Sequence, residues 1–350
     1  MLLAIGCGDD STVDSGRDAA SSGSDSAVAD SATDAPPFDA ARPDVGSGRV
    51  PVFVAMGWGG RHIASCDMGR TWINDTSVSS EDDWHQSYTP KSLAYHDGVF
   101  VRMTGWGSTG NVHTSRDGLT WTSVQFADRS ATSVGYDDRW LILSDISIYE
   151  SNDGVEWGVR EGAPFSDLNR DGAVYPGIWI SGADGNVEFN RGEGWENLAS
   201  CNGTRHESIG VSGGFAASPG RVVSFGSDGS TCAVDRNTGA DLGAGSIGAN
   251  ISGVGAYVGG EFWVGSGDQL HRSSDGLSWT SETLASGARF ELVADSGEGT
   301  IAAASRNGDV FYYSDDNGAS WQQAEAPEGN DIYRMVFGWA EPSVQCPGER

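Results

Sequence analysis

The stretch SRDGLTW at residues 115–121 is one copy of a phrase, Ser-x-Asp-Gly-x-x-Trp, that this chain writes repeatedly. Four more copies keep its Ser, Asp, Gly and Trp, two of them with one extra residue, at 65–72, 151–157, 273–279 and 314–321. Weaker copies lie at 190–195 and 231–235. Self-similarity at a regular spacing is the signature of a repeat architecture, so this phrase decides the fold.

The spacing of the phrase gives the number of repeats. The gap between Trp195 and Trp279 is two periods long and contains the weak copy at 231–235. Counted this way, Trp72 and Trp321 are six steps of about 42 residues apart, which is the length of a four-stranded propeller blade. The sequence therefore predicts an all-β, seven-bladed β-propeller over residues 49–342.

One repeat also shows the strand pattern of a blade. Residues 92–96 alternate in polarity, an Asp-Gly turn follows, and residues 99–103 form a β-branched and aromatic run. Two further strands are expected, one before the phrase and one after it. The first repeat lacks an innermost strand, whereas residues 332–337 alternate like one with no repeat behind them. We therefore expect the C-terminal strand to pair into blade 1 and close the ring.

The phrase itself has a structural task. Its glycine permits a left-handed turn, its Ser and Asp side chains can bond nearby backbone N–H groups, and its tryptophan supplies a large ring to bury. Copies about 42 residues apart are spread around the rim, so their carboxylates do not converge on a metal. The residues assigned this structural role are Asp67, Trp72, Asp117, Trp121, Asp153, Trp157, Trp195, Asp275, Trp279, Asp316 and Trp321.

At these residues the chain resembles the Asp-box (BNR repeat) β-propeller family. That family includes sialidases, sortilin-type receptors, xyloglucan-cleaving glycosidases and a photosystem II assembly factor. The resemblance implies a propeller whose Asp-boxes lie at the periphery, on the face opposite the ligand site. It implies no catalytic residue and no particular function, because its members include both enzymes and pure binding proteins.

The N-terminus resembles the end of a bacterial lipoprotein signal. Residues 1–7 are apolar, then small, then Cys7, which the resemblance marks as the lipidation site of a truncated signal peptide. An apolar stub with a chance cysteine is the alternative. Residues 8–48 are rich in Asp, Ser and Ala and predict a disordered tether. We expect a lipid anchor at the outer membrane or cell surface of the cell envelope, or a secreted protein.

Charge and cysteines point to the same compartment. The formal net charge is −28, which disfavours nucleic acid as a partner, and we expect a monomer with no cofactor. Beyond Cys7, four cysteines allow three pairings. We favour Cys66–Cys346, which would tie the opening blade to the tail at residues 343–350, and Cys201–Cys232 between neighbouring blades. Four unpaired core cysteines are the alternative, since disulfides require an oxidising compartment.

Candidate ligand-binding residues gather on loops of the first two repeats. Trp58 and Trp106 each stand between two glycines, so their rings are expected at loop tips opposite the Asp-boxes. Exposed aromatic rings beside polar groups suit stacking on sugars. The alternative is that these rings pack between blades or fill the central channel. The candidate set is Trp58, Arg61, Trp84, His85, Tyr88 and Trp106.

Catalytic and metal patterns are weak. Glu81, Asp82 and Asp83 could serve a glycosidase, but acids are common in this chain and two must flank the scissile bond. A sialidase-like entry phrase finds only a partial match at residues 48–51. Asp167, Asn169 and Asp171 open a calcium-loop phrase, yet its twelfth position is Ile178, which cannot coordinate calcium. We predict no metal site, with an irregular calcium loop as the alternative.

Together these features favour a surface or periplasmic lipoprotein whose propeller is a non-catalytic binding or scaffold module for a glycan or protein ligand. A glycoside hydrolase of unknown specificity, sialidase-like or other, is the alternative. An assembly factor for an envelope protein complex is the second alternative.

Overall fold

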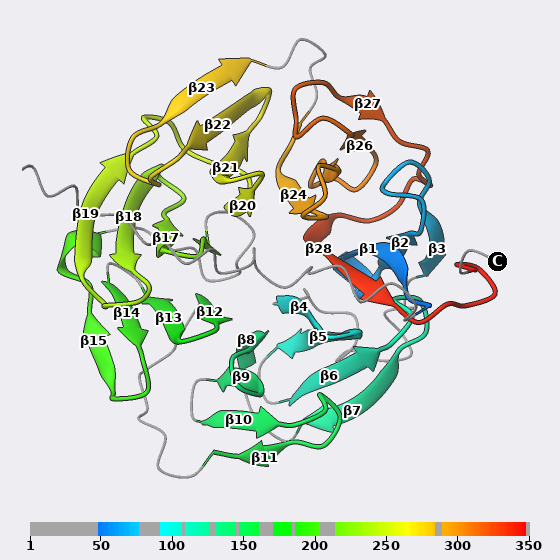
Figure 1. Cartoon of the computed structure of the whole chain (residues 1–350), viewed down its shortest axis with the longest axis horizontal. Helices are drawn as coiled ribbons and strands as arrows, with labels where there is room; N and C mark the ends of the chain where they lie inside the picture. Colours follow the sequence, from blue (N-terminus) through cyan, green and yellow to red (C-terminus); the bar gives the residue numbers. More distant parts are fainter. Residues whose placement is uncertain are drawn as a thin grey trace, which may run out of the picture. The chain divides into compact units, whose positions relative to one another are not determined.

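The chain folds into a ring of seven four-stranded antiparallel sheets, as the repeat count predicted (Figure 1). The computed structural model describes residues 48–76, 92–106, 109–126, 131–144, 147–160, 171–183, 186–203, 214–283 and 289–347. Cys7, the tether to residue 47, Trp84, His85, Tyr88, Asp167 and Asn169 lie outside the described residues. No helix in those ranges has the length and apolar character needed to cross a membrane.

Each blade is a meander whose first strand lies innermost and whose last lies at the rim, except in blade 1. From the inside outward, blade 1 holds β28 (Ile332–Ala340), β1 (Val50–Gly57), β2 (His62–Ser65) and β3 (Ile73–Thr76); blade 2 holds β4 (Ser92–His96), β5 (Val99–Trp106), β6 (Thr109–Ser115) and β7 (Thr122–Phe126); blade 3 holds β8 (Ala131–Tyr136), β9 (Trp140–Ser144), β10 (Ile148–Ser151) and β11 (Gly158–Val159).

The same order continues in the other blades. Blade 4 holds β12 (Asp171–Tyr175), β13 (Ile178–Ala183), β14 (Asn186–Asn190) and β15 (Trp195–Asn197); blade 5 holds β16 (Gly214–Ala217), β17 (Arg221–Phe225), β18 (Ser230–Asp235) and β19 (Asp241–Ser246); blade 6 holds β20 (Ala256–Val258), β21 (Glu261–Ser266), β22 (Gln269–Ser273) and β23 (Thr280–Thr283); blade 7 holds β24 (Leu292–Asp295), β25 (Ile301–Ala304), β26 (Phe311–Ser314) and β27 (Gln322–Gln323). Two short 3-10 helices, η1 (Trp58–Gly60) and η2 (Ala199–Cys201), follow β1 and β15.

The ring is closed by strand pairing between the two ends of the described chain. β28 runs antiparallel to β1 along its whole length, from Val50 opposite Ala340 to Met56 opposite Arg334. The rings of Phe53 and Phe337, which pair across the two strands, lie 4.9 Å apart. This arrangement confirms the predicted closure and leaves no inner strand without a partner among the described residues.

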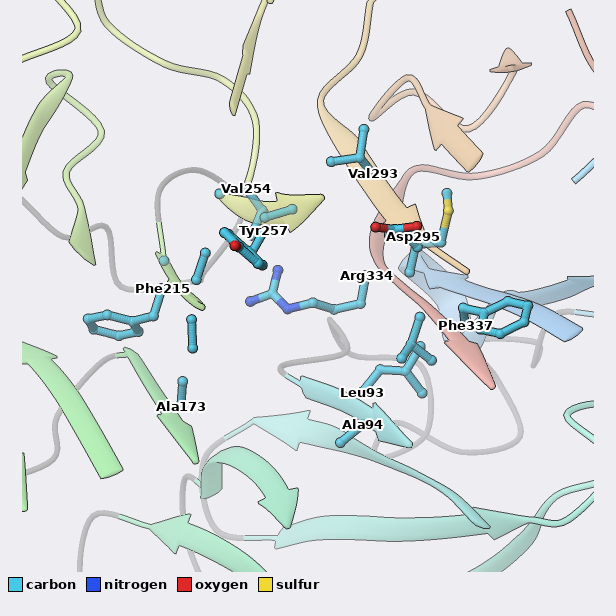
Figure 2. Close-up of a pocket in the computed structure, with 18 of the residues that line it drawn as sticks. Leu93, Ala94, Ala173, Phe215, Val254, Tyr257, Val293, Asp295, Arg334 and Phe337 are labelled. Carbon is cyan, nitrogen blue, oxygen red and sulfur yellow. The ribbon is translucent and has the colours of Figure 1, made fainter. Parts of the chain in front are cut away.

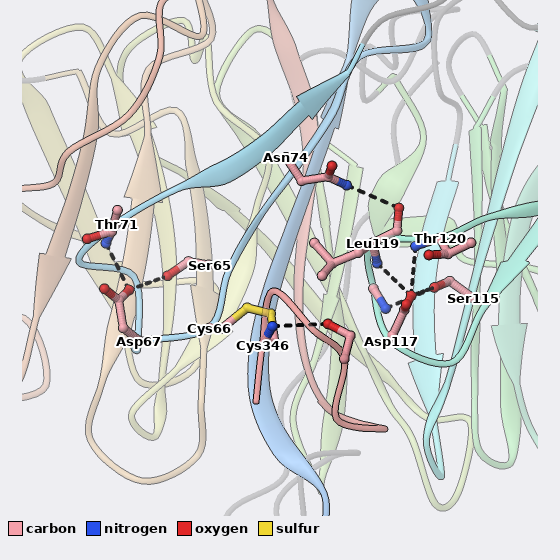
Figure 3. Close-up of a disulfide and its surroundings, with 12 residues drawn as sticks. Ser65, Cys66, Asp67, Thr71, Asn74, Ser115, Asp117, Leu119, Thr120 and Cys346 are labelled. Carbon is pink, nitrogen blue, oxygen red and sulfur yellow. Dashed lines mark hydrogen bonds between the residues drawn. A yellow bond between two sulfur atoms is a disulfide. The ribbon is translucent and has the colours of Figure 1, made fainter. Parts of the chain in front are cut away.

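The repeated phrase forms the turn between the third and fourth strands, as expected. In blade 2, Asp117 Oδ1 accepts hydrogen bonds from the N–H groups of Leu119 and Thr120 at 2.9 and 2.7 Å (Figure 3). Gly118 adopts φ +73°, which the turn requires, and donates its N–H to Ser115 Oγ. The phrase is therefore a self-contained hydrogen-bonded turn.

The hidden seventh copy keeps the same chemistry in degenerate form. Asp235 ends β18, and its Oδ1 accepts the N–H groups of Asn237 and Thr238 at 2.9 and 2.7 Å. This is the position that the Asp-box carboxylate takes in blade 2. The repeat count was therefore right to place a blade within the long gap.

The tryptophans of the phrase join neighbouring blades. Trp72 of blade 1 packs against Phe311 of blade 7 with ring centroids 4.5 Å apart, and Trp279 of blade 6 lies 5.6 Å from Phe225 of blade 5. The other Asp-box tryptophans are less deeply buried than Trp72, which is 3% exposed. The apolar core consequently lies between the blades, and these rings fill its outer part.

Both favoured disulfides are present. Cys66, just after β2, is bonded to Cys346 in the C-terminal tail, and Figure 3 shows this bond beside the Asp-boxes of blades 1 and 2. Cys201 in η2 is bonded to Cys232 in β18, which links blades 4 and 5. The first bond holds the tail next to the closing strand, and the second joins adjacent blades, as the sequence predicted.

Two faces of the ring follow from this topology. Turns between third and fourth strands, which carry the Asp-boxes, define the Asp-box face. Turns between second and third strands end at the opposite face; because Trp58 lies in such a turn between β1 and β2, we call it the Trp58 face.

Candidate functional site

The innermost strands of all seven blades surround a central cavity of about 570 Å³ (Figure 2). Its lining comes from β4, β8, β12, β16, β20, β24 and β28, together with a few turn residues. The side chains are mostly small or apolar, with tyrosines contributed by several blades. The cavity therefore exists because small residues such as Gly, Ala and Ser on the innermost strands do not fill the axis.

Only two charged residues occur among the described residues that line the cavity, Asp295 and Arg334. Asp295 ends β24, and its carboxylate accepts the N–H groups of Gly259 and Gly297, both at 2.8 Å. These bonds place Asp295 among the turns between first and second strands, at the Asp-box end of the cavity. Its oxygens are thus engaged with the backbone.

Arg334 lies at the other end of the cavity. Arg334 is opposite Met56 in the pairing of β28 with β1. Two residues after Met56, the N–H of Trp58 donates to Asp331 O at 2.8 Å, so this end of the pairing lies at the Trp58 face. Arg334 Nη1 donates to Tyr333 O at 2.8 Å. Figure 2 shows its side chain extending into the middle of the cavity. A cation therefore stands inside the cavity near the Trp58 face.

Tyr257 in β20 adds a polar group to the cavity wall, two blades away from Arg334. Its ring packs 5.0 Å from that of Phe262, and burial raises the pKa of its hydroxyl. The phenol is therefore neutral at neutral pH and can donate a hydrogen bond. The described lining offers apolar walls, one cation and neutral donors, a combination that suits binding an uncharged or anionic group.

The sequence-predicted ligand residues are only partly placed here. Trp58 is 45% exposed in η1, where Gly59 has φ +69° and completes the turn. Trp106 is the last residue of β5, and its side chain lies outside the described part of the structure. Trp84, His85 and Tyr88 also lie outside it. Among the ring-bearing residues of the predicted set, Trp58 is therefore the one whose side chain is described.

Arg61 has a different place from the one we expected. It is 1% exposed, and its Nε and Nη2 bind the Asp75 carboxylate at 2.9 and 3.0 Å. Its remaining donors reach the carbonyl oxygens of Gly308, Pro327 and Asn330. Because these donors bind protein acceptors, Arg61 joins blade 1 to blade 7 and does not face a ligand on the Trp58 face.

The calcium phrase is not assembled in the described residues. Asp171 begins β12, opposite Gly182 of β13, and its two partners in the phrase lie outside the description. No group of three or more His, Cys, Asp or Glu side chains within the described ranges is arranged to hold a metal ion.

Arg334 and Tyr257 were not singled out by sequence reasoning. The alternation of residues 332–337 did predict the inner strand that carries Arg334. A charged residue within an innermost propeller strand was the available signal, but its orientation depends on the register with β1.

No protein-family model and no curated protein matches the chain. Among solved structures, YCF48 bound to a D1 peptide is 16% identical with a TM-score of 0.50, over 78% of this chain and 89% of that one. YCF48 from Cyanidioschyzon merolae is 16% identical with a TM-score of 0.51, over 70% and 88%. AztD from Citrobacter koseri is 8% identical with a TM-score of 0.54, over 85% and 99%. At such identities the likeness shows the propeller fold alone.

Proposed function

We propose that this propeller is a non-catalytic binding module that takes a short segment of a partner protein into its central cavity from the Trp58 face. The observation that carries the proposal is Arg334, a cation that extends into an otherwise mostly apolar cavity of about 570 Å³. Volumes of about 300–1,000 Å³ are typical of ligand pockets. A solved propeller of the same fold, YCF48, has a D1 peptide bound, which supports a peptide as the class of ligand.

The chemistry of the cavity narrows the segment. Apolar side chains would contact the inner strands, and a carboxylate, from an acidic residue or a chain end, would bind Arg334. A charge-assisted hydrogen bond of this kind contributes about 1.5–3 kcal/mol. The partner would therefore present an apolar segment with at least one negative group. An assembly factor for an envelope complex is one setting for such binding.

A glycan is the second candidate ligand. Trp58 is 45% exposed on the same face as the mouth near Arg334, and an exposed indole can stack on a sugar ring. A glycoside hydrolase would use the same mouth and would turn over its substrate. Extracytoplasmic location is part of the proposal, supported by the two disulfides. The lipid anchor at Cys7 stays a prediction.

Selection from a phage-displayed library of short random peptides tests the proposal. Selected peptides should bind the protein and lose about tenfold or more in affinity when Arg334→Gln removes the cation. Arg116→Gln is the matched control, because Arg116 is 59% exposed in the Asp-box of blade 2 and faces away from the cavity. Its affinities should equal those of the unchanged protein.

Parallel screens separate the alternatives. Binding on a glycan array that Trp58→Ala abolishes and Arg334→Gln leaves intact would favour the lectin-like function. Turnover of fluorogenic glycosides would favour the hydrolase. Peptides that bind the Arg334→Gln variant as tightly as the unchanged protein would contradict the proposed cavity site.

A further inference from the structure

Arg102 in β5 is a buried arginine, and two of its three side-chain nitrogens have no hydrogen-bond acceptor among the described residues. Its side chain is 4% exposed, and within the described residues its Nε and Nη1 have no partner. The guanidinium lies over the ring of Trp121, 4.6 Å from the centroid. Arg272 provides a comparison, because it combines the same kind of stacking with acceptors. It lies 4.2 Å from the ring centroid of Trp263 and also donates to Glu282 and to a carbonyl oxygen.

The stacking on Trp121 does not account for the burial of Arg102. Desolvation lowers the pKa of Arg102 to about 10, so the side chain still carries its charge at neutral pH. Removing an ion from water costs several kcal/mol, whereas a desolvated cation–π contact contributes only about 2 kcal/mol. Buried polar groups in proteins almost always have partners, so a missing partner requires an explanation.

Apolar and neutral polar side chains surround Arg102. Leu93 pairs with Arg102 across β4 and β5, and it packs against the hydrophobic core that blades 1 and 2 share. His113 is directly opposite Arg102 in the β5–β6 pairing, and its Nε2 is 3.0 Å from Thr104 Oγ1. His113 and Thr104 are 2% and 3% exposed. Hydroxyl and imidazole groups can each donate to an anion.

The two nearby histidines are neutral. Burial, and next the charge of Arg102, lower the pKa of His62 to about 4 and that of His113 to about 3. Asp75, whose negative charge acts on His62, has both carboxylate oxygens bound to Arg61. Neither histidine nor Asp75 therefore supplies a counter-charge to Arg102.

We propose that the interface between blades 1 and 2 holds a small exchangeable anion, a carboxylate or an inorganic oxyanion, bound to the Arg102 guanidinium and to donors beside it. The site is distinct from the central cavity and does not depend on the proposed peptide binding. The site lies toward the Trp58 face, because His62, on which the charge of Arg102 acts, begins β2 two residues after the end of η1.

Isothermal titration of sodium acetate and of sodium phosphate, each into protein exchanged into a low-anion buffer, tests this site. We expect one saturable site for at least one of the two anions and a melting temperature that rises with its occupancy. Arg102→Met should weaken that binding at least tenfold or abolish it. The matched control, Arg116→Met, removes an exposed arginine and should bind like the unchanged protein.

The same variants report on the origin of the anion. With an exchangeable anion, Arg102→Met in low-anion buffer should melt at the same temperature as the unchanged protein or higher, because an unpaired buried charge has been removed. A lower melting temperature of Arg102→Met in every buffer, with no heat of anion binding to the unchanged protein, would show a permanent partner within the chain and overturn the proposal.

Crystals of the unchanged protein give a test that does not depend on the folding of a variant. After soaking in selenate, an inorganic oxyanion, an anomalous peak within hydrogen-bond distance of the Arg102 guanidinium is expected. Anomalous peaks confined to the protein surface, or binding heats that persist in Arg102→Met, would overturn the proposal.

Discussion

Blade 1 contacts blade 7 on one side and blade 2 on the other, and each contact buries one arginine. On the blade 7 side, Arg61 is 1% exposed and binds one carboxylate and three carbonyl oxygens. On the blade 2 side, Arg102 is 4% exposed and its Nε and Nη1 have no acceptor in the described residues. The two side chains are equally deep in the protein and differ in whether their donors are satisfied.

This difference separates a structural arginine from a binding one. Arg61, which directly precedes β2, donates to carbonyl oxygens of residues that lie 247 to 269 positions further along the sequence. It therefore links the two ends of the ring. The contact with blade 2 is made by other groups: Tyr95 donates to Trp339 O, Asn74 donates to Leu119 O, and the partly exposed Arg49 binds Asp97. The ring can therefore hold at that interface while the charge of Arg102 stays available to a ligand.

Removing Arg61 should have the largest effect on stability. Arg61→Met would leave the Asp75 carboxylate and three carbonyl oxygens without their donor, and breaking a buried ion pair costs about 3–5 kcal/mol. Urea unfolding followed by tryptophan fluorescence measures the loss. In low-anion buffer Arg61→Met should thus lower stability, whereas Arg102→Met should leave it unchanged or raise it.

An exposed ion pair provides the control for Arg61. Arg70 binds Asp315 at 2.8 Å, and both side chains are more than 40% exposed. Arg70→Met should cost less than about 1 kcal/mol, because solvent screens the pair. Equal losses in the Arg61 and Arg70 variants would show that burial and hydrogen bonding do not distinguish these arginines.

Acid should weaken the blade 1–blade 2 contact through His113. Its folded-state pKa of about 3 lies below the ordinary value of 6.5, because of burial and the charges of Arg102 and His62. Between these values the unfolded chain binds a proton that the folded chain does not. Stability is therefore complete above pH 6.5 and falls by about 3 kcal/mol on going to pH 4.

The variant His113→Gln isolates this contribution, since glutamine does not titrate. Urea unfolding between pH 7 and pH 4 should show a shallower loss in His113→Gln than in the unchanged protein, whatever the offset between them at pH 7. Parallel pH profiles would mean that His113 takes up its proton over the same pH range in the folded and the unfolded chain. The positive charge of Arg102 would then have to be compensated by another group.

The fold could be predicted because its determinants are local and repeated. Each Asp-box needs only a few consecutive residues to form its turn, so seven copies reveal seven blades even when one has decayed to Asp235. Ring closure was also readable, because residues 332–337 alternate like an inner strand with no repeat behind them. The disulfides followed from the positions of the cysteines on that frame.

The sites could not be predicted in the same way. Arg61, Arg102 and Arg334 are the same residue type, yet Arg61 joins two blades, Arg102 has two nitrogens without an acceptor in the described residues, and Arg334 extends into the cavity. The carbonyl partners of Arg61 lie about 250 residues away in the sequence, and a register shift of one residue would reverse which face each side chain takes. Arg61 was assigned to the ligand set with Trp58, yet the two residues have different environments: Trp58 is exposed and Arg61 is buried.

A small loss of stability is expected from an Asp-box variant, which tests whether loosening blade 2 is enough to abolish anion binding. Asp117→Asn weakens the bonds to Leu119 and Thr120 and should cost about 1 kcal/mol. Asp275→Asn makes the same change in blade 6, where Asp275 bonds Leu277 and Ser278. Urea unfolding should give similar losses for the two variants.

The response to acetate or phosphate then decides between two explanations of the Arg102→Met result. If Arg102 itself binds the anion, both Asp-box variants should keep the affinity of the unchanged protein, since neither carboxylate is bonded to Arg102. A different outcome is that Asp117→Asn loses anion binding as completely as Arg102→Met while Asp275→Asn keeps it. Anion binding would then depend on the integrity of blade 2. Arg102 would in that case be a structural residue, like Arg61, and the two contacts of blade 1 would not differ in function.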